Sequence, residues 1–306
     1  MMVDSQWAFR PAGHHTPADA RPRARFAWRL WAWAEAERGR ERVAGCHYRP
    51  GWGDDVARWT WPTALPILVV VTFRDRLLAT IRAAKPVLEA PGVMVVDSEV
   101  PNLLEPGAAA TLIVSQDLDV GVPVEHHAEV KRQVAELHAF RASPEEPSVW
   151  VPREPGLLEV NFIGMDPTQD PAEAYVLDDD QLPLLVFGAL SLVSPGVELD
   201  LMETRVRLPR AAGLVLEKLV TDRTGEKGER DLLVALGLLM TATPDDIDEV
   251  EIMFRRLRPE LRHVVRSNLT ILSLLEARPG MPDPGPHRAD VAALLRRLEG
   301  EEGSDP

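Results

Sequence analysis

From residue 66 onward, apolar and polar positions follow periods that predict regular helices and strands. Residues 73–89 place apolar side chains at helical spacing, which predicts one amphipathic helix. Residues 92–96 form a short apolar run typical of a buried strand. A helix is then expected from Ser98, a favoured N-cap residue, with Glu99 bonding at its start. The apolar run at 111–124 predicts a second strand.

The pattern continues with alternating elements and ends in a helical region. Residues 124–141 predict an amphipathic helix, "SVWV" and 157–164 predict strands, and the length of the apolar run 182–193 favours a helix. "VELDL" and "TRVRL" predict a β-hairpin. The helices expected after Pro209 are 210–223, 227–242, 245–257, 260–277 and 287–299. The expected fold class is therefore α+β, with a core over residues 66–209 followed by a helical region over residues 210–306.

The first 65 residues differ from the rest of the chain. They hold seven of the eight tryptophans, and Pro, Gly and His interrupt them so often that no sustained period is present. One interpretation is a Trp-rich surface that anchors a partner or a membrane. The interpretation we favour is an irregular N-terminal extension that is disordered, or that reflects a start codon assigned too early.

Two aspartates interrupt the apolar run 111–124. Asp117 and Asp119 are two residues apart, so on a strand their side chains share a face and repel each other. A divalent cation relieves that repulsion, and Mg²⁺ prefers a few carboxylates with water and phosphate oxygens. Metal binding at a strand end is one interpretation. A solvated edge strand with acids facing water is the other.

A cation and an acid can be placed in the helical region by their distance from a turn. Lys218 and Asp231 lie seven and six residues from Gly225, so a helix hairpin centred there brings them to the same level. They could form a cationic clamp for a triphosphate, with Arg223 adding positive charge nearby. A salt-bridged, exposed hairpin is the alternative.

The order of these motifs resembles the nucleotidyltransferase superfamily typified by DNA polymerase beta, over roughly residues 73–245. More narrowly, the chain is similar to toxin-type, abortive-infection nucleotidyltransferase-like proteins. The stretches that carry the resemblance are "VMVVDSEVPNLL", "SQDLDV", "LEKLVTDR" and "ERDLLVALGLL".

The resemblance implies a nucleotidyltransferase-like mixed sheet with flanking helices, and a role for each matching residue. It implies that Asp117 and Asp119 hold Mg²⁺ and that Lys218, oriented by Asp231, holds the triphosphate. It also places Asp97-Ser98 where relatives carry a phosphate-contacting Gly-Ser pair.

Two positions depart from the pattern of the family. Asp97 stands where relatives have glycine, and a carboxylate there repels phosphate. Many relatives place a third carboxylate on a later strand, where this chain has Asn161, with Glu159 two residues earlier on the same face. Asn161 offers an amide oxygen to a metal but no charge, and Glu159 is the candidate substitute.

The expected activity is Mg²⁺-dependent transfer of a nucleotidyl group from an NTP to an RNA or protein acceptor. A cognate antitoxin is a further expected partner. Three alternatives stay open: a catalytically degenerate relative that binds a nucleotide or a partner, a D-x-D glycosyltransferase, and a purely structural helical scaffold.

Composition narrows the expected partners and location. The formal net charge of −14 disfavours broad affinity for nucleic acid or anionic membranes. The single cysteine, Cys46, excludes an internal disulfide framework. No apolar run approaches the roughly 20 residues that span a bilayer. A cytoplasmic protein without a membrane partner is the expectation.

Overall fold

A mixed β-sheet is the centre of the part of the chain that the structure, a computed structural model, describes. The described residues are 72–104, 113–221 and 225–300. The predicted N-terminal extension and Arg223 lie outside them. The strands of the sheet are β1 (Met94–Val95), β2 (Asp117–Pro123), β3 (Phe140–Ala142), β4 (Val149–Pro152), β5 (Glu159–Met165), β6 (Ala174–Leu177) and β7 (Leu184–Phe187).

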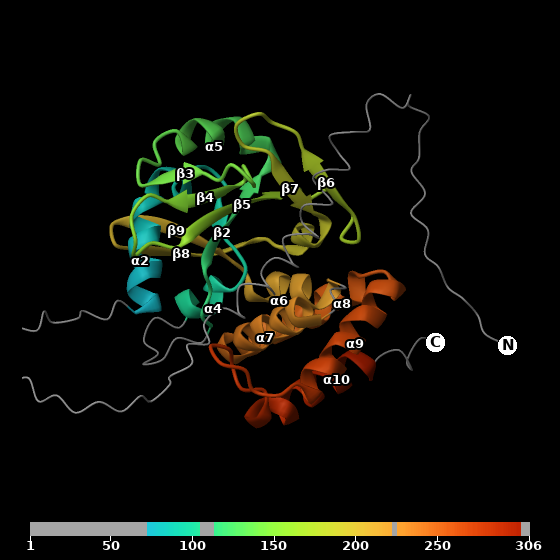
Figure 1. Ribbon diagram of the computed structural model, residues 1–306. Coiled ribbons are helices and arrows are strands. Elements are labelled where there is room, and N and C mark those ends of the chain that lie inside the picture. Colours follow the sequence, from blue (N-terminus) through green and yellow to red (C-terminus); the bar gives the residue numbers. More distant parts are fainter. Residues whose placement is uncertain (1–71, 105–112, 222–224, 301–306) are drawn as a thin grey trace, which may run out of the picture. The chain divides into compact units, whose positions relative to one another are not determined.

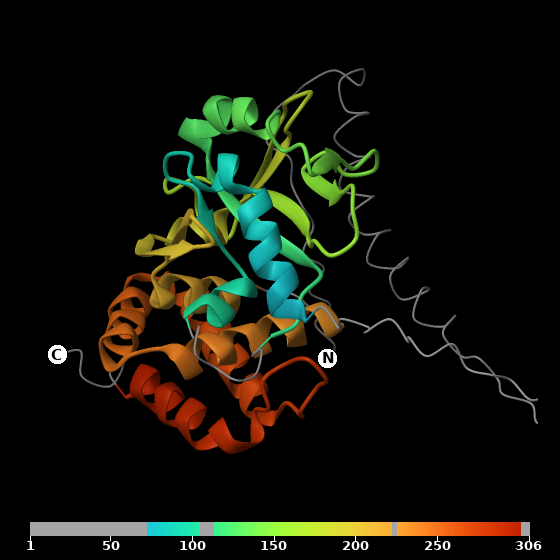
Figure 2. The ribbon, with the colours of Figure 1, turned by 90° about the vertical axis from the view of Figure 1, so that its left-hand side faces the viewer.

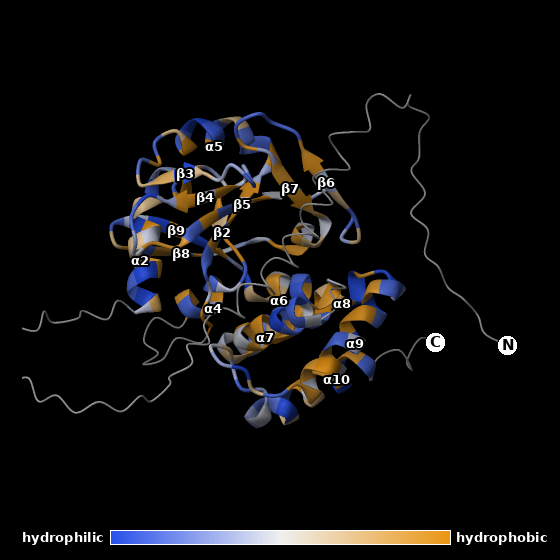
Figure 3. Cartoon of the chain, viewed as in Figure 1, coloured by the Kyte–Doolittle hydropathy of each residue, from blue (hydrophilic) through white to orange (hydrophobic). Residues whose placement is uncertain are grey.

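The sheet is built around the pair β2 and β5. These two strands are parallel, β1 is antiparallel to β2 on the outer side, and β4 and β3 follow β5 with antiparallel pairing. The last residues of β5 also pair with β7, which is parallel to it and antiparallel to β6. β2 and β5 are therefore paired along both edges. Figure 3 shows β7, which borders β5, and β6 beyond it as mainly hydrophobic.

The helix predicted over residues 73–89 is divided in two. α2 (Phe73–Ala83) begins with a capping box in which Thr72 and Asp75 bond each other's backbone, and α3 (Lys85–Leu88) follows after Ala84. Pro86 explains the division, because proline has no N–H for the helical ladder and its ring collides with the carbonyl four residues earlier.

The helix predicted over residues 124–141 is shorter than expected. A 3₁₀ turn, η2 (Val124–His126), leads into α5 (His127–Val134), and Phe140 belongs to β3. Leu137 and Phe140 are buried as their apolar character suggests. Phe140 lies opposite Pro152 of β4, so strand pairing replaces the helix here.

The prediction of a helix over residues 182–193 is wrong in its first half. Leu184 and Val186 alternate with half-buried neighbours in β7, and a 3₁₀ helix, η3 (Gly188–Leu192), follows. β7 lies between β5 and β6, so both of its edges are hydrogen-bonded and the apolar run is explained by burial in a sheet. β6 was not predicted.

The predicted hairpin and the five C-terminal helices are confirmed, with shifts of a few residues at their ends. The hairpin consists of β8 (Pro195–Leu201) and β9 (Thr204–Pro209). The helices are α6 (Ala211–Val220), α7 (Gly225–Thr241), α8 (Pro244–Arg256), α9 (Pro259–Leu274) and α10 (Arg288–Glu299), with a 3₁₀ turn, η4 (Gly285–His287), before the last. Together with the mixed sheet they confirm the expected fold class, an α+β core followed by a helical region.

The helices α6 to α10 gather on one side of the sheet, where α4 (Glu99–Leu104) lies between β2 and α7 in both ribbon views (Figures 1 and 2). One hydrophobic cluster runs from Leu77 of α2 to Leu298 of α10. α6 is buried at every position, so its charged residues are carried into the interior with it. None of the described helices is long and apolar enough to cross a membrane.

Candidate functional site

The two aspartates of the D-x-D motif stand at the start of β2. Asp119 is buried and Asp117 half-buried, whereas Leu118 between them points into the core. Ser115 fixes Asp117: its hydroxyl donates to Asp117 Oδ1 over 2.8 Å, and the Asp117 N–H donates to Ser115 Oγ over 3.2 Å. This carboxylate is therefore held in place by the residues that lead into the strand.

The neighbouring strand β5 brings Glu159 and Asn161 beside the aspartates. In the parallel register Glu159 lies opposite Asp117, and Asn161 lies opposite Asp119. Asn161 Nδ2 donates a hydrogen bond of 2.7 Å to Asp119 Oδ1, which shows that these side chains share one face. Four side chains with oxygen atoms thus lie at the starts of two adjacent strands.

The connection from β1 to α4 approaches the same strand. The Val96 N–H donates to the Asp119 carbonyl oxygen over 3.0 Å, which places Asp97 and Ser98 next to the D-x-D motif. Asp97 has a φ of 69°, in the left-handed region where glycine is favoured. Asp97 therefore has a backbone conformation that favours glycine while carrying a carboxylate.

Glu99 was expected to bond at the start of a helix, but it belongs to the acidic cluster instead. Its side chain is fully buried, and Ser98 Oγ donates to its Oε1 over 2.7 Å. Its other oxygen, Oε2, is buried without a hydrogen-bond partner among the described residues. The Ser98 hydroxyl is directed at this carboxylate.

Lys218 of α6 is the cation at the centre of these acids. Its Nζ lies 2.7 Å from Asp97 Oδ2 and 3.2 Å from Glu217 Oε2, and its side chain is only 3% exposed. Asp231 of α7 is also buried, and its charge acts on Lys218 across the α6–α7 hairpin. Both residues are therefore buried on packed helices, which the exposed-hairpin alternative did not anticipate.

The electrostatics of the cluster reflect burial and like charge. Burial, followed by the charges of Asp117 and Asp97, raises the pKa of Glu99 to about 8. Burial, followed by the charges of Asp117, Asp97 and Glu99, also raises the pKa of Asp119 well above its ordinary value, although the Asn161 hydrogen bond opposes this. At neutral pH one or both of these groups retains a proton unless a cation is bound.

For Lys218, in contrast to the acids, the surroundings favour the charged form. Burial alone would lower its pKa, but the charges of Asp97, Glu217 and Asp231 and the hydrogen bond to Asp97 outweigh burial and raise the pKa above its ordinary value. Lys218 is therefore a permanent cation, and it compensates only part of the surrounding negative charge.

The structure thus brings together Asp97, Ser98, Asp117, Asp119, Asn161, Lys218 and Asp231, with Glu159 opposite Asp117 at the exposed start of β5. Glu99 and Glu217 were missed, and their only sequence signal is their position next to Ser98 and Lys218. Within residues 72–104, 113–221 and 225–300, no group of three or more His, Cys, Asp and Glu side chains is arranged as a ready-made metal site.

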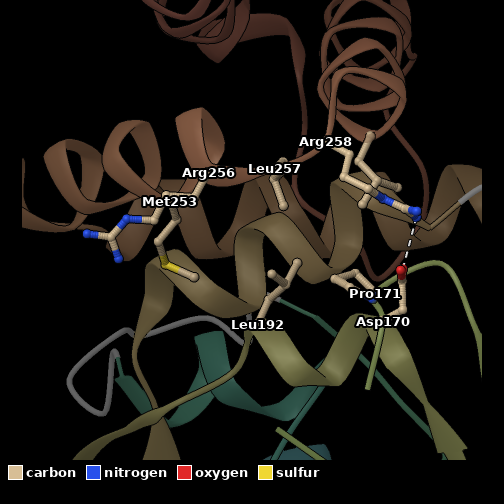
Figure 4. Close-up of a pocket in the computed structure, with 8 residues that line it drawn as sticks. Asp170, Pro171, Leu192, Met253, Arg256, Leu257 and Arg258 are labelled. Carbon is tan, nitrogen blue, oxygen red and sulfur yellow. Dashed lines mark hydrogen bonds and ion pairs between the residues drawn. The ribbon is translucent and has the colours of Figure 1, made fainter. Parts of the chain in front are cut away.

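A cavity of about 330 Å³ lies elsewhere in the fold, between η3 and the junction of α8 and α9 (Figure 4). Its lining consists of Asp170, Pro171, Leu192, Met253, Arg256, Leu257, Arg258 and Leu261. Arg258 pairs with Asp170 over 2.9 Å at one side of it. It contains none of the residues of the acidic cluster, so the two features are separate.

The comparisons with known proteins include a distant structural likeness. No protein-family model matches the chain, and no curated protein sequence is similar to it. A crystal structure of an antigenic nucleotidyltransferase-like protein from Paracoccidioides brasiliensis is similar with a TM-score of 0.37 and 14% sequence identity, over 73% of this chain and 93% of that chain. At this level of similarity the function has to be argued from the site itself.

Proposed function

We propose that this protein binds a nucleoside triphosphate together with Mg²⁺ and transfers its nucleotidyl group to an acceptor. The observation that carries the proposal is the register of β2 and β5, which sets Asp117 and Asp119 opposite Glu159 and Asn161 on one face. A buried lysine, Lys218, lies within the same charge cluster. Oxygen donors next to a fixed cation are what a metal-bound polyphosphate requires.

The donor set fits Mg²⁺. Asp117 and Asp119 supply carboxylates, Glu159 and the Asn161 amide oxygen are further candidates, and all are oxygen ligands of the kind that Mg²⁺ prefers. Burial is the largest cause of the raised pKa of Asp119, and the charges of Asp117, Asp97 and Glu99 add to it. A bound cation would offset the part that comes from like charge. When bound, the metal would neutralise charge on the transferring phosphate and activate the acceptor oxygen.

The protein's own residues would hold the substrate in place. Lys218 would bind phosphate oxygens, and Asp231 and Glu217 would keep its ammonium group in position. Ser98 is the proposed phosphate contact on the β1–α4 connection, once its hydroxyl turns from Glu99. The toxin-type relationship, the RNA or protein acceptor and the cognate antitoxin are part of this proposal, and the sequence resemblance supports them.

A second candidate function is nucleotide or partner binding without transfer. Two observations favour it. Asp97 already forms an ion pair with Lys218, and Asn161 stands where many relatives of the resembled family carry a third carboxylate. The D-x-D glycosyltransferase is less favoured, because among the described residues only the two-residue strand β1 precedes β2.

Calorimetry with Mg²⁺ and each NTP tests the binding step. Asp117→Asn and Asp119→Asn should each abolish Mg²⁺-dependent binding, because each removes a metal carboxylate. Neither change should lower the melting temperature, since repulsion is relieved and the amide oxygen introduced by Asp119→Asn can still accept from Asn161. The matched control is Asp200→Asn, because Glu198 and Asp200 repeat the acid-x-acid spacing on the exposed strand β8.

Asp200→Asn should bind Mg-NTP like the wild type. If the wild type binds no Mg-NTP at millimolar concentrations while the Asp117 and Asp119 variants unfold, the pair is structural and the proposal is wrong. Transfer is followed separately with labelled NTP and RNA or protein acceptors, and Asn161→Asp should increase it. If both the wild type and the Asn161→Asp variant bind Mg-NTP without transferring the labelled nucleotide, the second candidate function is identified.

A further inference from the structure

The ion pair between Asp97 and Lys218 joins two parts of the fold that are far apart in sequence. Asp97 belongs to the connection between β1 and α4, and Lys218 belongs to α6 in the helical region. Their charged atoms are 2.7 Å apart, the distance of a strong charge-assisted hydrogen bond. The lysine that we propose as a phosphate ligand is therefore already bound to an anion of the protein.

The backbone of Asp97 is held in an unusual conformation. Only three non-glycine residues in the described part of the chain have positive φ: Asp97 at 69°, Met202 at 52° and Glu203 at 64°. The last two form the turn of the β8–β9 hairpin, where such values are ordinary. Asp97 lies instead in the turn that leads into α4, where its carbonyl oxygen accepts from the Val100 N–H over 3.3 Å. From this backbone position its side chain pairs with Lys218.

Asp97 differs from the other acids around Lys218 in its accessibility. Glu217 and Asp231 are buried on helices α6 and α7. The Asp97 side chain is 24% exposed, although the lysine it binds is 3% exposed. Of the three acids whose charges act on the ammonium group, Asp97 is the one that an incoming anion can reach and replace without moving a helix.

We propose that the Asp97 carboxylate is a built-in competitor of the phosphate ligand, and that a polyphosphate binds Lys218 by displacing it. The ligand class is an anionic polyphosphate, and its identification as a nucleotide rests on the function proposed above. Displacement breaks one ion pair of Lys218 and forms another, so the net binding free energy of free phosphate is small. A polyphosphate carrying Mg²⁺ gains more, because the cation also offsets the repulsion from Asp97, Asp117 and Asp119.

The test measures inorganic triphosphate binding by calorimetry, with and without Mg²⁺, to full-length wild type and Asp97→Asn. Asparagine keeps the size of the side chain and tolerates the left-handed backbone, so this change isolates the charge. We expect Asp97→Asn to bind triphosphate at least about tenfold more tightly, a difference of about 1.4 kcal/mol. The matched control is Glu203→Gln, which removes one negative charge from another residue of positive φ, and its affinity should equal that of wild type.

A second measurement follows the lysine itself. The chain has four lysines (85, 131, 218 and 227), so the ammonium signals of ¹⁵N-lysine-labelled protein can be assigned by substitution of the other three. Triphosphate should shift the Lys218 signal at lower concentration in Asp97→Asn than in wild type. If the signal of Lys218 is unaffected in both proteins at saturating triphosphate, the anion does not replace Asp97 and the inference is overturned.

The outcomes separate this inference from the proposed function. If Asp97→Asn melts at a lower temperature but binds triphosphate no more tightly than wild type, the contact is only structural and the inference fails. That result leaves Mg-NTP binding through Asp117 and Asp119 intact. A tenfold gain for triphosphate in a protein that binds no NTP would support the displacement of Asp97 and reject the nucleotide as the ligand.

Discussion

Glu99 and Asp119 are buried among other acids, which disfavours the charged form of each carboxyl group. Both pKa values are raised, with burial as the largest cause in each case. One oxygen of Glu99 also lacks a hydrogen-bond partner among the described residues. Buried carboxyl groups with raised pKa values are more frequent at functional sites than in ordinary cores, because they remain ready to bind a proton or a cation.

The raised pKa of Glu99 predicts that stability declines as the pH rises through the neutral range. The native protein holds a proton on Glu99 up to a pKa of about 8, whereas the unfolded chain loses it near the ordinary value of 4.5. Between these values the native state binds more protons, so the free energy of unfolding falls by up to about 1.4 kcal/mol per pH unit for one such group. Thermal melting without added metal, from about pH 5 to pH 8, measures this slope.

Glu99→Gln should flatten that slope and raise the melting temperature at the upper end of the pH range. Glutamine keeps an oxygen to accept from Ser98 but has no proton to lose. Glu198→Gln, on the exposed strand β8, is the control and should leave the slope unchanged. A slope as steep in Glu99→Gln as in wild type would show that another group titrates, and Asp119→Asn would be examined next.

The sequence reached much of the residue-scale geometry through spacing. Alternation along a strand predicts that Asp117 and Asp119 share a face, and both lie in β2. Distance from Gly225 predicts that Lys218 and Asp231 lie at one level, and both are buried on the packed helices α6 and α7. The role of Glu99 could not be predicted in this way, because a short helix has too few residues for a period to show which face is buried. The Asp97–Lys218 pair also needed the structure, since its members are brought together by the tertiary fold.

At the scale of elements, sequence periodicity predicted the C-terminal helices and the β8–β9 hairpin better than it predicted the elements around the sheet. The five C-terminal helices and the β8–β9 hairpin were predicted with small errors at their ends. The run 182–193 was misassigned, because a strand buried on both edges and a buried helix have the same apolar composition. The break between α2 and α3 could have been foreseen from Pro86, whereas the early end of α5 depends on pairing between β3 and β4.

The buried lysine of α6 leads to a prediction about stability. Lys218→Met should destabilise the protein by about 3–5 kcal/mol, because Asp97, Glu217 and Asp231 would remain near one another without their shared cation. Chemical denaturation at pH 7 measures the loss. Lys227→Met, at an exposed position on α7, is the matched control and should change stability by less than about 0.5 kcal/mol.

A Lys218→Met protein as stable as wild type would mean that the buried acids take up protons and tolerate the loss. In that case the midpoint should depend more steeply on pH than in wild type, since protonation of those acids would then support the fold. A variant with unchanged stability and unchanged pH dependence would contradict the cluster described here.

At the scale of the whole molecule, the sheet and the helical region share one hydrophobic core. Buried side chains from α2, the sheet and helices α6 to α10 belong to one cluster, which crosses the predicted boundary at residue 209. The ion pair between Asp97 and Lys218 also joins residues from the two sides of this boundary. The candidate site thus depends on the contact between these two parts, and changes in their packing should affect ligand binding.

The same continuous core supports the prediction that residues 1–64 are dispensable for folding. A chain that begins at Leu65 retains every described element and the Thr72–Asp75 capping box of α2. It should melt cooperatively within about 3 °C of the full-length protein, which corresponds to roughly 1 kcal/mol for a domain of this size. A chain that begins at Arg76 is the comparison. It loses the capping box and Phe73, which packs against the core, and its melting temperature should fall clearly.

If the chain from Leu65 instead loses several kcal/mol of stability, as expected when core aromatic residues are removed, the tryptophans of the first 65 residues are part of the folded protein and the predicted boundary is wrong.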